Sequence, residues 1–241
     1  MSRTVIRARM LGVLGVMAAL AAAVWVGGGT AVAAEIESSI ARGGRLYDAW
    51  YIENKAGKPD DPNPVYPKDA KYEKDSWRCK ECHGWDYKGK DGAYGSGRRA
   101  TGIKGIRGAA GKDSAAIAAI LRDKNHPYKE TMLTERDVTD LANFVSKGQF
   151  DADKVIDAPS KKAKGDLAKG EIYYNTLCAG CHGLDGKKVT TGPALGSQAG
   201  NPALILHKAY NGQPNEAMPA LRSLDPQIGV DLVAYVQTLP Q

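Results

Sequence analysis

The sequence has very few phenylalanines, and this scarcity restricts how its interior can be built. Only two Phe occur in 241 residues, beside 28 Gly and 11 Tyr. A core made of conventional apolar side chains looks thin, so we expect something else to help fill the interior. Hydrophobic residues make up 43% of the chain and charged residues 25%, as in ordinary globular proteins. This composition excludes wholesale disorder, a collagen and a multi-span membrane protein.

The sequence also lacks long blocks of like charge. Its formal net charge of +6 falls to +3 without residues 1–34, because that segment holds three Arg and no acidic residue. In the remainder, Lys alternates with Asp and Glu, which is typical of a solvated surface. No basic tract is present, so we expect no nucleic acid partner.

Residues 1–34 have the layout of a secretory signal peptide. Three Arg precede an apolar run at 10–26, and an A-x-A site at 31–34 follows it. We therefore expect a periplasmic protein. The alternative is an uncleaved anchor, because the run is near the lower limit of about 17–25 residues for crossing a bilayer. Association with a membrane is expected only if this segment is retained.

Two C-x-x-C-H motifs use all four cysteines of the chain, at residues 79–83 and 178–182. The motif is typical of covalent haem c attachment. Two thiols three residues apart in a helical turn can reach the two vinyl groups of one haem, and the His then faces the iron. The sequence therefore predicts two haem c groups, attached at Cys79, Cys82, Cys178 and Cys181, with His83 and His182 as iron ligands.

Three other uses of these cysteines explain the pattern less well. Structural disulfides suit an exported protein but do not explain a His after each pair. A thioredoxin-like dithiol needs a βαβ context, which is missing here. A zinc site is conceivable, although the pairs lie 99 residues apart, beyond the usual spacings of zinc ligands.

Methionine supplies the candidates for the second axial ligand of each iron. Outside residues 1–34 only Met132 and Met218 occur, one after each motif and each before an amphipathic stretch. Met218 lies in an A-M-P-x-L loop, 36 residues after His182. We expect Met132 to be the second ligand of the first iron, although it lacks the following Pro and His126, six residues upstream, is the rival ligand. We expect His207 to be a surface residue or to face a haem propionate.

The second half resembles the class I cytochrome c family over about residues 165–240. Gly170 and Tyr174 match the N-terminal helix of the family, and Leu232 and Tyr235 match its C-terminal helix. The resemblance implies that these helices cross at Gly170, where a missing Cβ lets the backbones approach. It also implies that a carbonyl in the loop at 192–195 orients His182.

The first half has the same order of helix pairs and haem motif, with an inserted loop and a different loop after the motif. Gly43 and Tyr47 correspond to the first helix pair, and Leu141 and Phe144 to the second. Tyr47 is 32 residues from Cys79, so a loop is inserted at about 51–78. No Gly-Pro loop that would orient His83 is visible, although Gly102-Ile103 could occupy its place.

We therefore predict an all-α fold with two cytochrome c-like haem domains in tandem, after a signal peptide at 1–34. Domain 1 spans 35–150, a polar linker 151–165, and domain 2 166–241. Periodicity predicts helices at about 36–50, 113–123, 134–147, 166–177, 202–211 and 226–238.

The predicted function is electron transfer rather than catalysis. A six-coordinate haem has no open site for substrate, so the protein would carry single electrons between a redox donor protein and an acceptor protein. The alternative is a cytochrome subunit of an oxidoreductase, or a dihaem enzyme of the peroxidase or thiosulfate dehydrogenase type. An available Met for each haem argues against the peroxidase. The lack of a spare Cys argues against the thiosulfate dehydrogenase.

Overall fold

The computed structural model describes residues 33–68 and 70–241. The predicted signal peptide or anchor falls almost entirely outside these residues. No helix in the described part of the chain is long and apolar enough to cross a membrane. Contacts between residues divide the chain into two units, Met1–Ser38 and Ser39–Gln241. The second unit contains both cysteine motifs.

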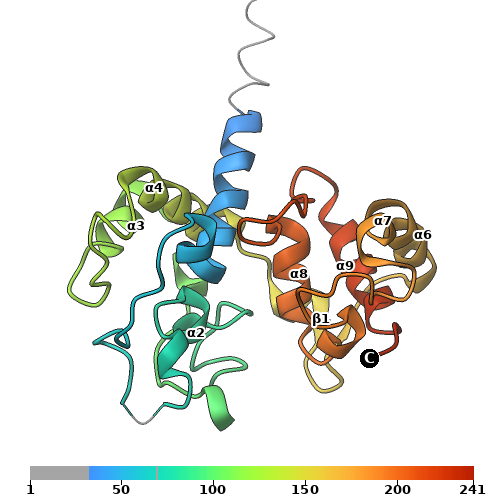
Figure 1. Ribbon diagram of the computed structural model, residues 1–241, viewed down its shortest axis with the longest axis horizontal. Helices are drawn as coiled ribbons and strands as arrows, with labels where there is room; N and C mark the ends of the chain where they lie inside the picture. The colour runs from blue at the N-terminus through green and yellow to red at the C-terminus, as the bar shows by residue number, and fades with distance from the viewer. Residues whose placement is uncertain (1–32, 69) are drawn as a thin grey trace, which may run out of the picture. The chain divides into compact units, whose positions relative to one another are not determined.

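The first half of this second unit is built from short helices joined by long loops (Figure 1). Residues 33–53 are helical, and the predicted insertion at 51–78 is irregular apart from its two ends. The next α-helices are α2 (Cys79–His83), α3 (Ser114–Ile120) and α4 (Glu135–Asn143), and a π-helical turn η4 (Phe144–Gly148) continues α4. Short 3₁₀ turns are η1 (Glu73–Asp75), η2 (Gly97–Arg99) and η3 (Arg107–Ala109).

The second half gathers four helices around the other motif (Figure 1). These are α6 (Leu167–Leu177), α7 (Ala179–His182), α8 (Pro202–Asn211) and α9 (Pro226–Val236), with a 3₁₀ turn η5 (Leu195–Gln198). Their bounds agree with the periodicity to within a few residues, so the helical prediction is confirmed for the described chain. The start of each long helix is capped by a side chain, from Asp166 for α6, Asn201 for α8 and Asp225 for α9.

The predicted linker at 151–165 is more ordered than its polar composition suggests. It forms helix α5 (Ala152–Val155) and a two-stranded antiparallel ladder of β1 (Ile156–Asp157) and β2 (Lys162–Ala163). The turn between the strands places Lys161 at φ 55°. Gln237, just after α9, accepts from the Ala163 N–H and donates to the Lys161 carbonyl. The fold is therefore mostly helical with one small hairpin. Gln237 holds this hairpin in place by its hydrogen bonds to the linker backbone.

A glycine in each half allows two helices to cross at very short range. A Cβ on Gly43 would lie 2.0 Å from the Asp140 carbonyl oxygen, and one on Gly170 would lie 2.1 Å from that of Asp231. These contacts join the helix at 33–53 to α4, and α6 to α9. The crossings predicted from Gly43 and Gly170 are thus present in both halves.

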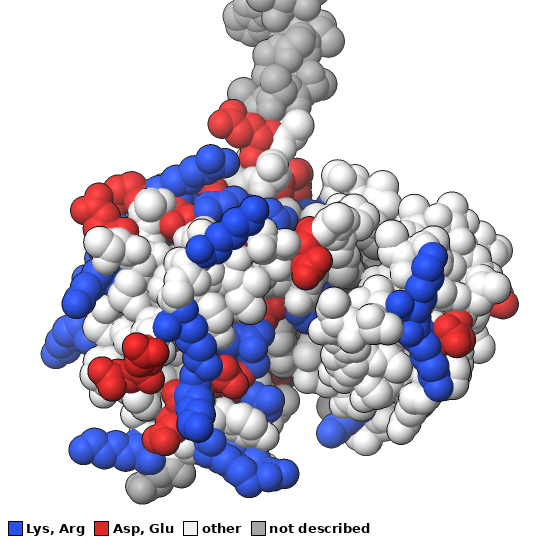
Figure 2. All heavy atoms as spheres, in the orientation of Figure 1, with Lys and Arg blue, Asp and Glu red and all other residues white. Residues whose placement is uncertain are grey.

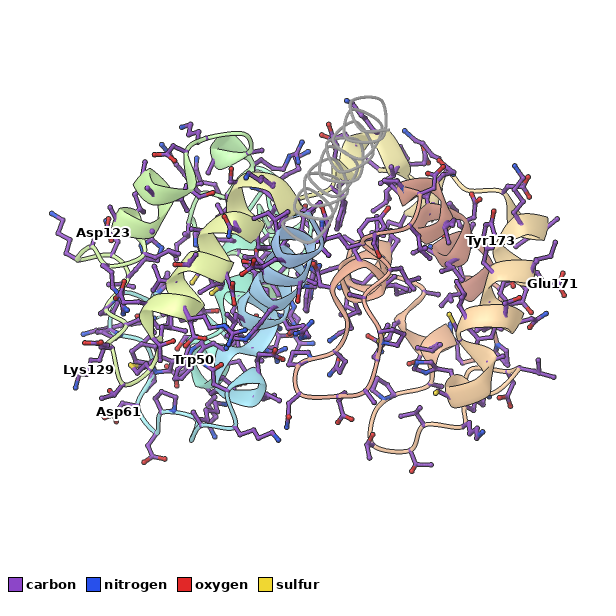
Figure 3. The ribbon with its side chains drawn as sticks, turned by 90° about the horizontal axis from the view of Figure 1, so that it is seen from above. Trp50, Asp61, Asp123, Lys129, Glu171 and Tyr173 are labelled. Atoms are coloured by element: carbon purple, nitrogen blue, oxygen red, sulfur yellow. The ribbon has the colours of Figure 1, made fainter. Side chains whose placement is uncertain are left out.

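The core of the first half combines aliphatic side chains such as Leu46 and Leu141 with a cluster of aromatic rings. Tyr47, Trp50, Tyr87 and Phe144 are each at most 1% exposed. Tyr47 packs on Phe144 with ring centroids 5.3 Å apart, as Tyr174 packs on Tyr235 in the second half. Figure 3 shows Trp50 inside the first half and Asp61 at its rim. The Trp50 indole donates to the Trp77 carbonyl at 3.0 Å, which attaches the inserted loop to this core, and the Trp77 indole donates to the Asp61 carbonyl within the loop.

Candidate haem sites

Each C-x-x-C-H motif forms one helical turn that ends at a glycine with a positive φ. The backbone of Gly84 has φ 77° and ψ 161°, and that of Gly183 has φ 79° and ψ 160°. Only glycine adopts this region without strain. The chain therefore leaves the helical turn in the same direction at both motifs.

A tyrosine from the preceding long helix holds each of these glycines. Tyr47 donates to the Gly84 carbonyl at 2.6 Å, and Tyr174 donates to the Gly183 carbonyl at 2.7 Å. Both tyrosines lie one turn beyond the glycine at which the helices cross. The two motifs are thus built into their surroundings by the same contacts, although 99 residues separate them.

Three of the four cysteines, Cys79, Cys82 and Cys178, have the raised pKa of partly buried thiols, whereas Cys181 is exposed. All four are free. Burial raises the pKa of Cys79 to about 11, of Cys82 to about 12 and of Cys178 to about 11. A thioredoxin-type dithiol requires a lowered pKa. Within the described chain no three Cys, His, Asp or Glu side chains gather as a metal site would require.

The ring of His83 is oriented by a residue that the sequence did not reveal. Its Nδ1 hydrogen-bonds to the Lys104 carbonyl at 2.6 Å. An isolated antiparallel bridge between Gly89 and Lys104 brings that carbonyl into place. Gly105 packs so closely that a Cβ there would lie 2.1 Å from the Tyr87 carbonyl oxygen. The orienting residue thus lies just after the Gly102-Ile103 pair suggested by the sequence.

A second imidazole faces His83 across the first site. The ring centroids of His83 and His126 are 6.2 Å apart, and the rings are inclined by 29°. Burial, and to a smaller extent the His126 ring, lower the pKa of His83 to about 4. His83 is therefore neutral near pH 7, which is the form that binds a metal.

Met132, the predicted ligand at the first site, lies in the turn before α4. It is half-buried, and its N–H donates to the Lys129 carbonyl at 2.9 Å. Figure 3 shows Lys129 and Asp123, which flank His126 in sequence, at the outer edge of this half. Among the aromatic and imidazole rings of the described chain, His126 is the one stacked on His83.

The second site is lined by aliphatic side chains and tyrosines. Tyr174, Leu232, Val236 and Leu239 form a buried cluster against which Cys178, Ile205 and Leu221 pack. Leu221 follows Met218 by three residues, and its N–H donates to the Ala209 carbonyl on α8. Leu221 therefore joins the loop that carries Met218 both to α8 and to this cluster. A cavity of about 550 Å³ adjoins this loop, lined by Arg45, Glu53 and residues 215–220.

His182 is held less firmly than His83. It is half-buried, and burial lowers its pKa. In the described part of the chain no carbonyl bonds to its ring, so the orienting contact implied for the loop at 192–195 is not formed. Figure 3 shows Glu171 and Tyr173 on the neighbouring helix α6, where Glu171 is exposed and Tyr173 packs on the cluster.

His207 is not the surface residue that the sequence suggested. It is fully buried between the halves, where its Nε2–H donates to the Gly44 carbonyl and its Nδ1 accepts from the Tyr87 hydroxyl. Its ring also lies 5.0 Å from that of Trp85, two residues after His83. One histidine on α8 gives no sequence signal for such a contact, because its partners come from distant parts of the chain.

Comparison with known proteins identifies the second half. Residues 165–236 match the family described as cytochrome c oxidase, cbb3-type, subunit III. A search of curated proteins found no matching relative. This part of the chain is accordingly a cytochrome c domain, which implies covalently bound haem c and is consistent with electron transfer. The thiol pair, the neutral His182 and the apolar cluster all fit such a group.

Proposed function

We propose that the protein is a dihaem c-type cytochrome that carries single electrons between an exported redox donor protein and an acceptor protein. The observation that carries this proposal is the shared construction of the two motifs. Each has a glycine crossing, a tyrosine bonded to the glycine after the His, and the same backbone angles at that glycine. A first half built in this way is suited to hold the same group as the cytochrome c domain that comes after it.

In this proposal each half attaches its own haem. Cys79 and Cys82 bind the first and Cys178 and Cys181 the second, with His83 and His182 as iron ligands. Met218 is the second axial ligand of the second iron. When bound, haem c supplies a reversible one-electron couple. The protein contributes position and insulation, through the aromatic core around the first motif and the aliphatic cluster around the second.

The contact between the halves suits a relay of electrons between the two groups. Trp85 continues directly from the first motif and packs on His207 of α8. Ile205, on the same helix, packs on the cluster that includes Cys178. Helix α8 therefore contacts the surroundings of both motifs, through His207 on one side and Ile205 on the other.

The N-terminal segment and the surface charge indicate the location of the protein and the kind of partner it binds. We propose export to the periplasm by the segment at 1–34, with membrane attachment only if that segment is retained. On the face seen in Figure 2, positive and negative side chains are interspersed over the first half, whereas the second half is largely free of charge. Such a surface suits a protein partner rather than a nucleic acid.

A cytochrome subunit of a larger oxidoreductase is the second candidate. It is favoured by the match at 165–236, because the matched family is described as a subunit of an oxidase. Mild extraction and co-purification separate the two proposals. A free carrier is purified alone, whereas a subunit is purified with stoichiometric partners.

The haem content tests the main proposal directly. Intact mass and a pyridine haemochrome count of the exported protein are expected to give two haems per chain. Replacing Cys79 and Cys82 by Ser should leave one haem, and so should replacing Cys178 and Cys181. A wild-type chain with one haem, or with two free thiols, contradicts the dihaem proposal.

A further inference from the structure

We propose that His126, rather than Met132, is the second axial ligand of the first haem iron, so that this haem is held between two imidazoles. The inference rests on the proposed haem at Cys79 and Cys82. It identifies the side chain that completes the coordination of the first iron. It also implies which of the two haems has the higher reduction potential.

The separation of the two rings is the first argument. Metal–imidazole bonds are about 2.0–2.1 Å long, so two imidazoles on opposite sides of one iron have centroids roughly 6 Å apart. The centroids of His83 and His126 are 6.2 Å apart. The observed separation therefore matches that of two imidazoles that bind one iron from opposite sides.

The hydrogen bonds of the two rings are the second argument. His83 uses Nδ1 to bond the Lys104 carbonyl, and His126 uses Nδ1 to bond the Asp123 carboxylate at 3.1 Å. Neither Nε2 has a partner in the described part of the chain. A partner at Nδ1 is the usual arrangement around a metal-bound histidine, because it fixes the tautomer and the ring orientation. Both rings therefore have the pattern of ligands.

The loop that carries His126 is fixed rather than free. Arg122 donates to the Tyr128 and Leu133 carbonyls, at 3.3 and 2.7 Å. Tyr128 in turn donates to the Trp77 carbonyl at 3.2 Å, two residues before Cys79. Its ring also packs on that of Trp77. The loop is thus attached directly to the start of the first motif, which places His126 without any rearrangement.

Two imidazole ligands give the first haem a lower potential than the second. A Met/His pair raises the haem potential relative to other ligand sets. The Asp123 carboxylate increases the basicity of His126, which favours Fe(III) further. Electrons would therefore move downhill from the first half to the second.

The ligand of the first iron is best tested in a protein that carries the Met218→Ala substitution. In it, the second haem has lost its thioether, so any remaining Fe(III)–thioether charge-transfer band must come from the first haem. We expect no such band. A band that persists in Met218→Ala and disappears on adding Met132→Leu would overturn the proposal and identify Met132 as the ligand.

Substitutions at His126 provide an independent measurement in the wild-type background. His126→Ala should raise one of the two midpoint potentials and let that haem bind CO, whereas Met132→Leu should change neither. His126→Met should create a second thioether band, which keeps the test valid if the Ala variant folds poorly. Unchanged potentials in both His126 variants would refute the assignment.

The haem count separates this inference from the proposed function. Two haems per chain with a thioether at both irons would leave the dihaem proposal intact and exclude His126 as the ligand. A single haem at Cys178 and Cys181 would instead remove the dihaem proposal itself.

Discussion

His207 should make the folded protein sensitive to mild acid. Its imidazole is fully buried between the halves, and burial lowers its pKa from 6.5 to about 3. Its two nitrogens are already used, one donating to Gly44 and one accepting from Tyr87, so protonation would break the second bond. The unfolded chain takes up a proton as the pH falls through 6.5, while the folded protein does not. The stability that neutral His207 contributes is therefore fully present above that pH and is lost progressively as the pH falls below it.

The size of the effect follows from these two pKa values. Between pH 7 and pH 5 the unfolded histidine changes from mostly neutral to mostly charged, which costs the folded state about 2 kcal/mol. Asp48 partly opposes the lowering of the His207 pKa, but its own pKa is lowered to about 2 by Lys208 and Arg78, despite burial. Lys208 and Arg222 reinforce the lowering of the His207 pKa.

The measurement is denaturant unfolding at pH 7 and pH 5, compared between wild type and variants. His207→Gln keeps one donor and one acceptor but does not titrate. Its free energy of unfolding should therefore fall by about 2 kcal/mol less than that of wild type between pH 7 and pH 5. Tyr87→Phe removes one hydrogen bond but leaves the titrating group, so it should lower stability at both pH values and keep a pH dependence. If wild type and His207→Gln lose the same stability, another group causes the acid sensitivity.

Two further predictions concern the helix crossing and a buried ion-pair network. Gly170→Ala places a Cβ 2.1 Å from the Asp231 carbonyl oxygen and should cost about 1–3 kcal/mol of unfolding free energy or more. Gly180→Ala, with nothing within 4 Å, should be close to neutral, and equal effects would refute the crossing. Arg42→Ala removes the partner of the buried Asp137 and Asp140 carboxylates and should cost about 3 kcal/mol by thermal or denaturant unfolding. Lys58→Ala breaks an exposed pair with Asp75 and should cost less than about 1 kcal/mol, so a similar loss in both variants would contradict the role of burial.

The sequence alone was enough for the local part of each site. Haem attachment needs two thiols and a His at fixed spacing in one helical turn, so Cys79, Cys82 and His83 could be identified without a structure. The helix of α8 likewise followed from periodicity, with the bounds that the structure has. Gly43 and Gly170 could be recognised from the resemblance to class I cytochromes c, and the structure shows that a side chain at either position would clash with the crossing helix.

Contacts between distant loops could not be read in this way. Lys104 orients His83 across 21 residues, and only the bridge to Gly89 brings its carbonyl to the ring. The stacking of His126 on His83 depends on a loop fixed by Arg122 and Tyr128. His207 has its partners more than 100 residues away. The sequence by itself therefore determined which residues can attach and ligate a haem, because that chemistry depends on spacing within one turn. Only the tertiary structure decided that the His126 ring lies beside the His83 ring and how the halves meet, because those contacts join segments whose separation along the chain carries no pattern.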